Sequence, residues 1–121
     1  MDDFRVIVAG SRSFNNEILL REKLDTLLSL KVDTHRVVIV SGGARGADLL
    51  GEGYASFRGF SCERYPAQWD KFGKKAGLLR NEQMARVADA LAAFWDGSSR
   101  GTKHMIDVMQ RAGKLVEVVQ F

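Results

Sequence analysis

Short apolar runs alternate along this chain with segments in which apolar residues recur every three or four positions. The runs predict β-strands at residues 4–9, 36–40, 60–65, 90–95 and 115–119. The run at 36–40 is rich in β-branched residues and shows no polar alternation, which is typical of a parallel strand covered on both faces. The run at 60–65 alternates between polar and apolar residues, which places it nearer a sheet edge, and Pro66 ends it.

Helical patterns fill the gaps between these runs. Asn15 or Asn16 can cap the first helix, Thr102 can cap the last one, and Gly113 is expected just after its end. A further helix is predicted at residues 75–87. The apolar side of the first helix is expected to carry Ile18, Leu20, Leu24, Leu27 and Leu28, that of the second Ala47, Leu50, Tyr54 and Phe57, and that of the last Met105, Val108, Met109 and Ala112.

Regular alternation of strands and helices predicts an α/β fold in which a mainly parallel sheet has right-handed crossovers and helices on both faces. The 121 residues suit one domain, which would span residues 1–121. The expected strand order is 3-2-1-4-5. This order places a topological switch point between the first and the fourth strand, where ligands bind in such sheets.

The amino-acid composition indicates the general class of protein and little more. With 45% hydrophobic and 27% charged residues, the chain has the composition of an ordinary soluble domain. Cys62 is the single cysteine, which excludes a disulfide within the chain and fits a reducing cytoplasm; on a strand it is expected to be a buried small apolar residue. No apolar run approaches the roughly 20 residues of a membrane span. We therefore expect a cytoplasmic protein with no membrane association, no metal site and no cofactor.

A basic and aromatic segment follows the third strand. Residues 67–75 are expected to form an irregular connection, and its Trp69 and Phe72 to belong to the core or to a lid. Residues 64–86 contain six basic residues against two acidic ones, a net charge of +4, whereas the whole chain has +3. These residues are Arg64, Lys71, Lys74, Lys75, Arg80 and Arg86, against Asp70 and Glu82. They form either a solvated polar face or a positive rim beside an anion site.

Glycine-rich polar loops follow the first, second and fourth strands, at residues 10–14, 41–48 and 96–102. The carboxyl ends of parallel strands share one edge of the sheet, so the three loops are expected to lie together. Backbone N–H groups, hydroxyls and an arginine in each loop suit phosphate oxygens, whereas Asp48 and Asp96 suit ribose hydroxyls or a base amine. The loop at 41–48 lacks the Lys-Ser/Thr pair of a Walker A motif and the spacing of the dinucleotide fingerprint.

Each of these features also has a purely structural interpretation. The glycine loop at 41–48 can be a tight strand-to-helix turn, and Asp48 lies in a first helical turn, where a carboxylate is favoured without any ligand. Thr102 can simply be a helix cap that contacts no ligand. His35 and His104 have no partner that their spacing assigns, so neither is taken as catalytic.

Four motifs together resemble one family. They are Gly10-Ser11-Arg12, the segment from Ser41 to Asp48, Ala76-Gly77-x-x-Arg80-Asn81, and Asp96-Gly97-x-Ser99-x-Gly101-Thr102. In this order they resemble the YspA-type, cpYpsA-related branch of the SLOG superfamily, found in bacteria and phages. The resemblance covers about residues 5–118 and implies a Rossmann-like fold that binds a nucleotide or a nucleotide-derived ligand.

Two groups of the superfamily differ from this chain in informative ways. The lonely-guy phosphoribohydrolases carry an Arg-Lys pair, which is Arg80-Asn81 here, and a glutamate whose position is Met105. A methionine cannot act as a general base, so Asp48, Asp96 or Asp107 would have to replace the glutamate. The DNA-processing protein DprA has a similar glycine loop, a Tyr-Pro pair that matches Tyr65-Pro66, and an Arg-Asn pair; it binds single-stranded DNA.

The leading hypothesis is therefore a domain that binds a nucleotide-derived small molecule, such as a nucleoside phosphate or an ADP-ribose-like molecule, as a sensor, a sequestering module or a processing protein. The alternatives are a hydrolase that cleaves an N-glycosidic or phosphate bond, with Asp48 or Asp96 as catalytic candidates, and a DprA-like binder of single-stranded nucleic acid. A homodimer through the outer helices is left open. The candidate ligand-binding residues are Gly10, Ser11, Arg12, Phe14, Ser41, Gly42, Gly43, Ala44, Arg45, Gly46, Asp48, Arg80, Asn81, Asp96, Gly97, Ser99, Gly101 and Thr102.

Overall fold

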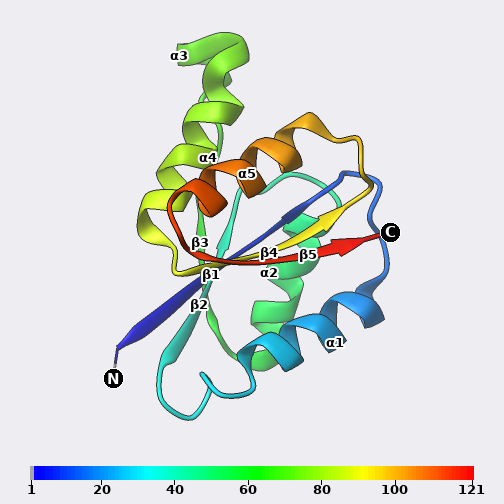
Figure 1. Ribbon diagram of the computed structural model, residues 1–121, viewed down its shortest axis with the longest axis vertical. Helices are drawn as coiled ribbons and strands as arrows, with labels where there is room; N and C mark the ends of the chain where they lie inside the picture. The colour runs from blue at the N-terminus through cyan, green and yellow to red at the C-terminus, as the bar shows by residue number, and fades with distance from the viewer. Residues whose placement is uncertain (1) are drawn as a thin grey trace.

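A five-stranded parallel sheet forms the centre of the computed structural model, which describes residues 2–121 (Figure 1). Its strands are β1 (Asp3–Gly10), β2 (Arg36–Ser41), β3 (Ser61–Arg64), β4 (Ala90–Trp95) and β5 (Leu115–Gln120). Their order is β3-β2-β1-β4-β5, so the predicted fold class and strand order are confirmed. β1 pairs with β2 on one side and with β4 on the other, which puts the switch point between β1 and β4.

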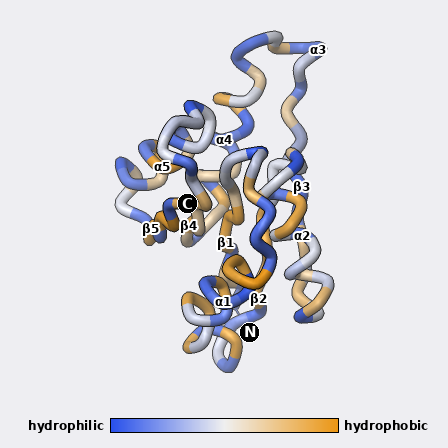
Figure 2. The backbone as a smooth tube through the Cα atoms, turned by 90° about the vertical axis from the view of Figure 1, so that its right-hand side faces the viewer, coloured by the Kyte–Doolittle hydropathy of each residue, from blue (hydrophilic) through white to orange (hydrophobic). Residues whose placement is uncertain are grey.

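Helices cover both faces of the sheet because the side chains of β1 alternate between two cores. Val6 and Val8 pack with residues of α1 (Glu17–Leu28) and α2 (Ala47–Arg58), whereas Ile7 and Ala9 pack with residues of α4 (Ala76–Val87) and α5 (Arg100–Arg111). This is the two-residue period of a strand that is buried on both sides. Figure 1 shows α1 and α2 on one side of the sheet and α4 and α5 on the other, and in Figure 2 the hydrophobic colour runs along β1 in the middle of the molecule.

Two of the three predicted capping positions are confirmed at the ends of the helices. Asn16 is the N-cap of α1, where its side-chain oxygen accepts a hydrogen bond from the Leu19 N–H at 3.1 Å. Gly113 follows the C-cap of α5 with a φ of +72°, as expected of glycine there. Ser99 rather than Thr102 caps the start of α5.

Some residues predicted to be buried are exposed. Ile18 and Phe57 belong to the predicted apolar sides of α1 and α2, but they are 71% and 56% exposed. The Arg21 guanidinium lies 4.1 Å from the centre of the Phe57 ring, so a cation–π contact takes the place of burial. Cys62 is exposed rather than buried, because β3 is the outermost strand on its side of the sheet.

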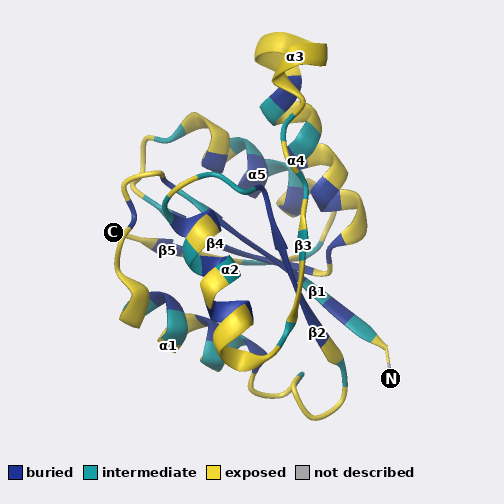
Figure 3. Cartoon of the chain, turned by 180° about the vertical axis from the view of Figure 1, so that it is seen from behind, coloured by how far each residue is buried: buried dark blue, intermediate teal, exposed yellow. Residues whose placement is uncertain are grey.

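The segment between β3 and α4 is helical rather than irregular. It forms the one-turn helix α3 (Trp69–Phe72) and the 3-10 turn η1 (Gly73–Lys75), which lead directly into α4. All of its residues from Trp69 to Lys75 are exposed, and Figures 1 and 3 show α3 at the tip of the molecule, beyond the end of the sheet. Sequence patterns of apolar spacing cannot detect such a turn, since it buries none of its side chains.

None of the helices formed by residues 2–121 combines the length and the apolar character that crossing a membrane requires.

Candidate functional site

The first and third polar loops touch at the switch point. The Ser11 N–H donates to the Phe94 carbonyl oxygen at 2.9 Å, and the Asp96 N–H donates to the Ser11 hydroxyl at 3.1 Å. Gly10 allows this approach, because a Cβ atom there would lie 2.2 Å from the same Phe94 oxygen. The loop after β1 is thus fixed to β4 and to the loop that follows it by one backbone hydrogen bond and one to the Ser11 side chain.

The second polar loop is held by a network of its own. The Ser41 hydroxyl donates to Glu52 at 2.7 Å and accepts from the Gly43 N–H at 3.0 Å. Glu52 also forms an ion pair with Arg64. Ser41 therefore holds the glycine loop in place through its hydrogen bonds. Because Arg64 is paired with Glu52, it adds less uncompensated positive charge to the basic segment than a count of basic residues suggests.

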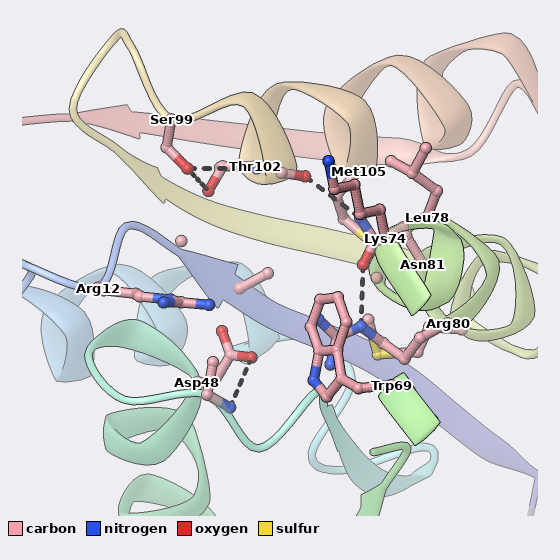
Figure 4. Close-up of a pocket in the computed structure, with 16 residues that line it drawn as sticks. Arg12, Asp48, Trp69, Lys74, Leu78, Arg80, Asn81, Ser99, Thr102 and Met105 are labelled. Carbon is pink, nitrogen blue, oxygen red and sulfur yellow. Dashed lines mark hydrogen bonds between the residues drawn. The ribbon is translucent and has the colours of Figure 1, made fainter. Parts of the chain in front are cut away.

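A cavity of about 250 Å³ lies between these three loops and the helices α3, α4 and α5 (Figure 4). It opens at the carboxyl ends of β1, β2 and β4, as predicted for this fold. The lining residues are Ala9, Gly10, Arg12, Ala44, Asp48, Trp69, Lys74, Gly77, Leu78, Arg80, Asn81, Met84, Ser99, Gly101, Thr102 and Met105. Each of the four motifs singled out in the sequence contributes residues to the lining of this cavity.

Half of the candidate residues line the cavity and half do not. Those that line it are Gly10, Arg12, Ala44, Asp48, Arg80, Asn81, Ser99, Gly101 and Thr102. Those that do not are Ser11, Phe14, Ser41, Gly42, Gly43, Arg45, Gly46, Asp96 and Gly97. The sequence predicts which loops form the site, but it does not predict which side chain of each loop faces the cavity.

Several residues outside the cavity have clear structural contacts. The Phe14 ring packs in the core, with its centre 4.8 Å from that of Phe94 and 4.9 Å from that of Phe121. The Asp96 carboxylate accepts hydrogen bonds from the N–H groups of Ser98 and Ser99 at 2.9 and 2.8 Å. These bonds lower the pKa of Asp96 below its usual value.

Asp48 is the single carboxylate among the lining residues. Burial raises its pKa from 3.8 to about 6, although a hydrogen bond from the Ala44 N–H at 3.3 Å and the positive charge of Arg80 act in the opposite direction. Of the three aspartates that could replace the glutamate of the lonely-guy enzymes, only Asp48 lines the cavity. Asp107 is ion-paired with Lys103 instead.

Arg80 reaches from α4 onto the glycine loop. Its Nη1 atom donates to the Gly42 carbonyl oxygen at 2.7 Å and to the Tyr65 carbonyl oxygen at 3.4 Å. Gly42 leaves room for this contact, since a Cβ atom there would lie 2.3 Å from Arg80 Nη1. Burial lowers the pKa of Arg80, but an arginine side chain keeps its charge in proteins. Arg80 thus brings a partly buried positive charge to the cavity wall.

The start of α5 closes another side of the cavity. The Asn81 amide donates to the Gly101 carbonyl oxygen at 3.2 Å and lies 3.2 Å from His104 Nδ1, so it joins α4 to α5. The Trp95 Nε1–H donates to the Ser99 carbonyl oxygen at 3.0 Å and anchors the loop before the helix. In Figure 4 Ser99 and Thr102 face the space above Arg12 and Asp48.

The sequence interpretation did not assign Trp69, Lys74, Leu78 or Met84 to the site. Trp69 and Lys74 belong to the segment 67–75, whose fold as α3 and η1 was not predicted. The basic charge of this segment was the one feature of the sequence that pointed to its place beside the site. Among residues 2–121, no group of three or more His, Cys, Asp or Glu side chains is placed to hold a metal ion.

The chain is similar to known proteins in its sequence and in its fold. The sequence model of the YspA, cpYpsA-related SLOG family matches residues 4–72. The Gene 61 protein of Mycobacterium phage D29 is 37% identical over 123 residues, which cover 97% of this chain and 95% of that protein. A solved structure of DNA processing protein A from Helicobacter pylori superposes with a TM-score of 0.61 at 18% identity.

The superposition with DNA processing protein A covers 95% of this chain but 64% of the other, so this chain spans less than two thirds of that protein. At this identity the likeness is one of fold. The family match covers more than half of the residues, and it agrees with the resemblance inferred from the four motifs. The chain therefore belongs to the YspA, cpYpsA-related SLOG family.

Proposed function

We propose that this protein binds a small phosphorylated nucleotide derivative in the cavity between the three loops. The observation that carries the proposal is that segments far apart in the sequence line one cavity with three cationic side chains, Arg12, Lys74 and Arg80, and one carboxylate, Asp48. Cationic side chains and loop N–H groups suit a phosphate. A carboxyl group beside them suits ribose hydroxyls or a base amine.

The size of the cavity narrows the ligand class. Ligand pockets commonly enclose about 300–1,000 Å³, and this cavity of about 250 Å³ lies just below that range. A ligand with one base, one sugar and one or two phosphates suits it better than a dinucleotide. We therefore favour a nucleoside phosphate over an ADP-ribose-like or dinucleotide ligand.

Arg12 provides the sharpest test of phosphate binding. Arg12→Ala is expected to weaken the binding of a nucleoside monophosphate about tenfold or more, because a charged hydrogen bond to an anionic oxygen is lost. Isothermal titration calorimetry with AMP, GMP, CMP and UMP measures this loss. Arg45→Ala is the matched control, since Arg45 is an exposed arginine of the neighbouring loop that does not line the cavity. Equal affinity of the two variants for every nucleotide would contradict the assignment.

Single-stranded nucleic acid is a second candidate ligand. The DNA processing protein A structure that shares this fold is described for its binding of single-stranded DNA. In this chain the exposed Lys71, Lys74 and Lys75 lie on the projecting segment next to the cavity, where a strand backbone could follow them. Such binding would depend strongly on salt, because each phosphate contact releases counterions.

Lys75 separates the two candidates, because it is exposed and does not line the cavity. If a strand is the ligand, Lys75→Glu is expected to weaken binding of a fluorescent oligothymidylate and to reduce the salt slope by about 1. Lys23→Glu makes the same charge change on α1, on the opposite face of the sheet, and should have little effect. If only a nucleotide is bound, neither variant changes its affinity and no salt-dependent strand binding is found.

A further inference from the structure

Apolar surface gathers on one side of the cavity. Leu78, Met84 and Met105 supply it near α4 and α5, beside Lys74, Arg80 and Asn81, whereas Arg12, Asp48, Ser99 and Thr102 supply polar groups on the other side. Figure 4 shows Trp69 across the cavity from Arg12, on the side of Leu78 and Met105. A nucleotide combines a charged phosphate with a flat, weakly polar base, and an aromatic ring with apolar neighbours can contact such a base.

Trp69 is the one aromatic side chain among the described residues that line the cavity. Its side chain is 54% exposed, and none of the four residues of α3 is buried, so packing of the core does not account for its position. Gly77 allows the indole to lie close against α4, because a Cβ atom there would come within 3.3 Å of the ring carbon Cη2. A glycine in the first helical turn thus leaves the ring its place at the mouth of the cavity.

We propose that Trp69 is the surface on which the nucleobase stacks, so that the cavity selects phosphates that carry a base over sugar phosphates that lack one. This inference rests on the proposed function and adds the feature that defines the ligand class. Stacking on an aromatic ring tolerates different bases, because every base has a π-face. The site is therefore expected to require a base and to distinguish only moderately between bases.

The test compares base-bearing and base-free probes. The affinities of AMP, GMP, CMP and UMP, and of ribose 5-phosphate, are measured by isothermal titration calorimetry on the full chain. Trp69→Ala is expected to lose about tenfold or more in affinity for the nucleotides, as stacking on an aromatic ring predicts, and to leave ribose 5-phosphate unchanged. Trp69→Phe should retain most of the affinity, because it keeps an aromatic face.

Phe72→Ala is the matched control. Phe72 is an exposed aromatic residue of the same short helix, at 42% exposure, but it does not line this cavity. Since both aromatic side chains are exposed, either alanine variant is expected to fold, which circular dichroism verifies. Unchanged nucleotide affinity in Trp69→Ala, or equal losses for ribose 5-phosphate, would overturn the stacking role while the proposed function stands. Absence of binding of every probe to the wild-type chain at millimolar concentration would overturn both.

Discussion

Replacing Gly46 by alanine is expected to lower the free energy of unfolding by about 3 kcal/mol, because strain and overlap add at one position. Gly46 has a φ of +86° and a ψ of −131°, a backbone conformation that is essentially restricted to glycine. A Cβ atom there would also lie 2.5 Å from the Ser11 carbonyl oxygen and 2.7 Å from that of Arg12. Both are backbone atoms of the neighbouring loop, so relief would have to move the loop itself. Urea unfolding followed by circular dichroism measures the change.

Gly53→Ala is the matched control for this variant. Gly53 lies inside α2, the helix that Gly46 precedes, and a Cβ atom there would meet nothing within 4 Å. Alanine is expected to stabilise this position by about 0.5–1 kcal/mol, because it restricts the unfolded chain and favours the helix. Similar free energies of unfolding for the two variants would show that the contact between the first and second loops is not as close as described.

The second large effect is the contribution of Asp48 to the dependence of stability on pH. Its pKa is raised by burial from 3.8 in the unfolded chain to about 6 in the folded one. A raised folded-state pKa contributes stability that is fully present below the unfolded pKa and is lost as the pH rises through the folded pKa. The full contribution is about 3 kcal/mol, by the conversion of one pKa unit to 1.36 kcal/mol, and most of it is lost between pH 4 and pH 7.

Asp48→Asn removes the titration while keeping an oxygen that can accept from the Ala44 N–H. The variant is therefore expected to be more stable than the wild type at pH 7 and to lose that advantage at pH 4. Asp96→Asn gives the contrast, because the pKa of Asp96 is lowered by the N–H groups of Ser98 and Ser99. Its carboxylate contributes stability above the unfolded pKa, which is lost as the pH falls through the folded one. A parallel pH dependence in Asp48→Asn and the wild type would contradict the assignment.

The fold was predictable because its signals are local and repeated. The strands β2 and β4 are unbroken apolar runs, and each is followed by a glycine-rich polar loop. The order of the strands follows from right-handed crossovers, which leave few alternatives. Parallel strands end at one edge, so the meeting of the three polar loops could be inferred without any coordinates.

The limits of prediction appear in individual side chains. Arg12 and Arg45 occupy comparable loops, but only Arg12 lines the cavity, because the direction of a side chain depends on backbone angles that residue spacing does not encode. Trp69 was missed for another reason. It lies on a single exposed turn with no apolar period, and its place beside Gly77 is set by the packing of α3 against α4. Phe14 was assigned to the site as part of the polar loop at residues 10–14, whereas its ring packs between Phe94 and Phe121.

The two tryptophans of the chain have a practical consequence for the study of this protein. Trp69 lines the cavity, and Trp95 is bonded through its ring nitrogen to the loop that forms another part of the wall. The tryptophan emission of the chain therefore originates next to the cavity. Quenching or a spectral shift would report occupancy without a dye or an isotope, and a library of compounds could be screened on the unmodified protein.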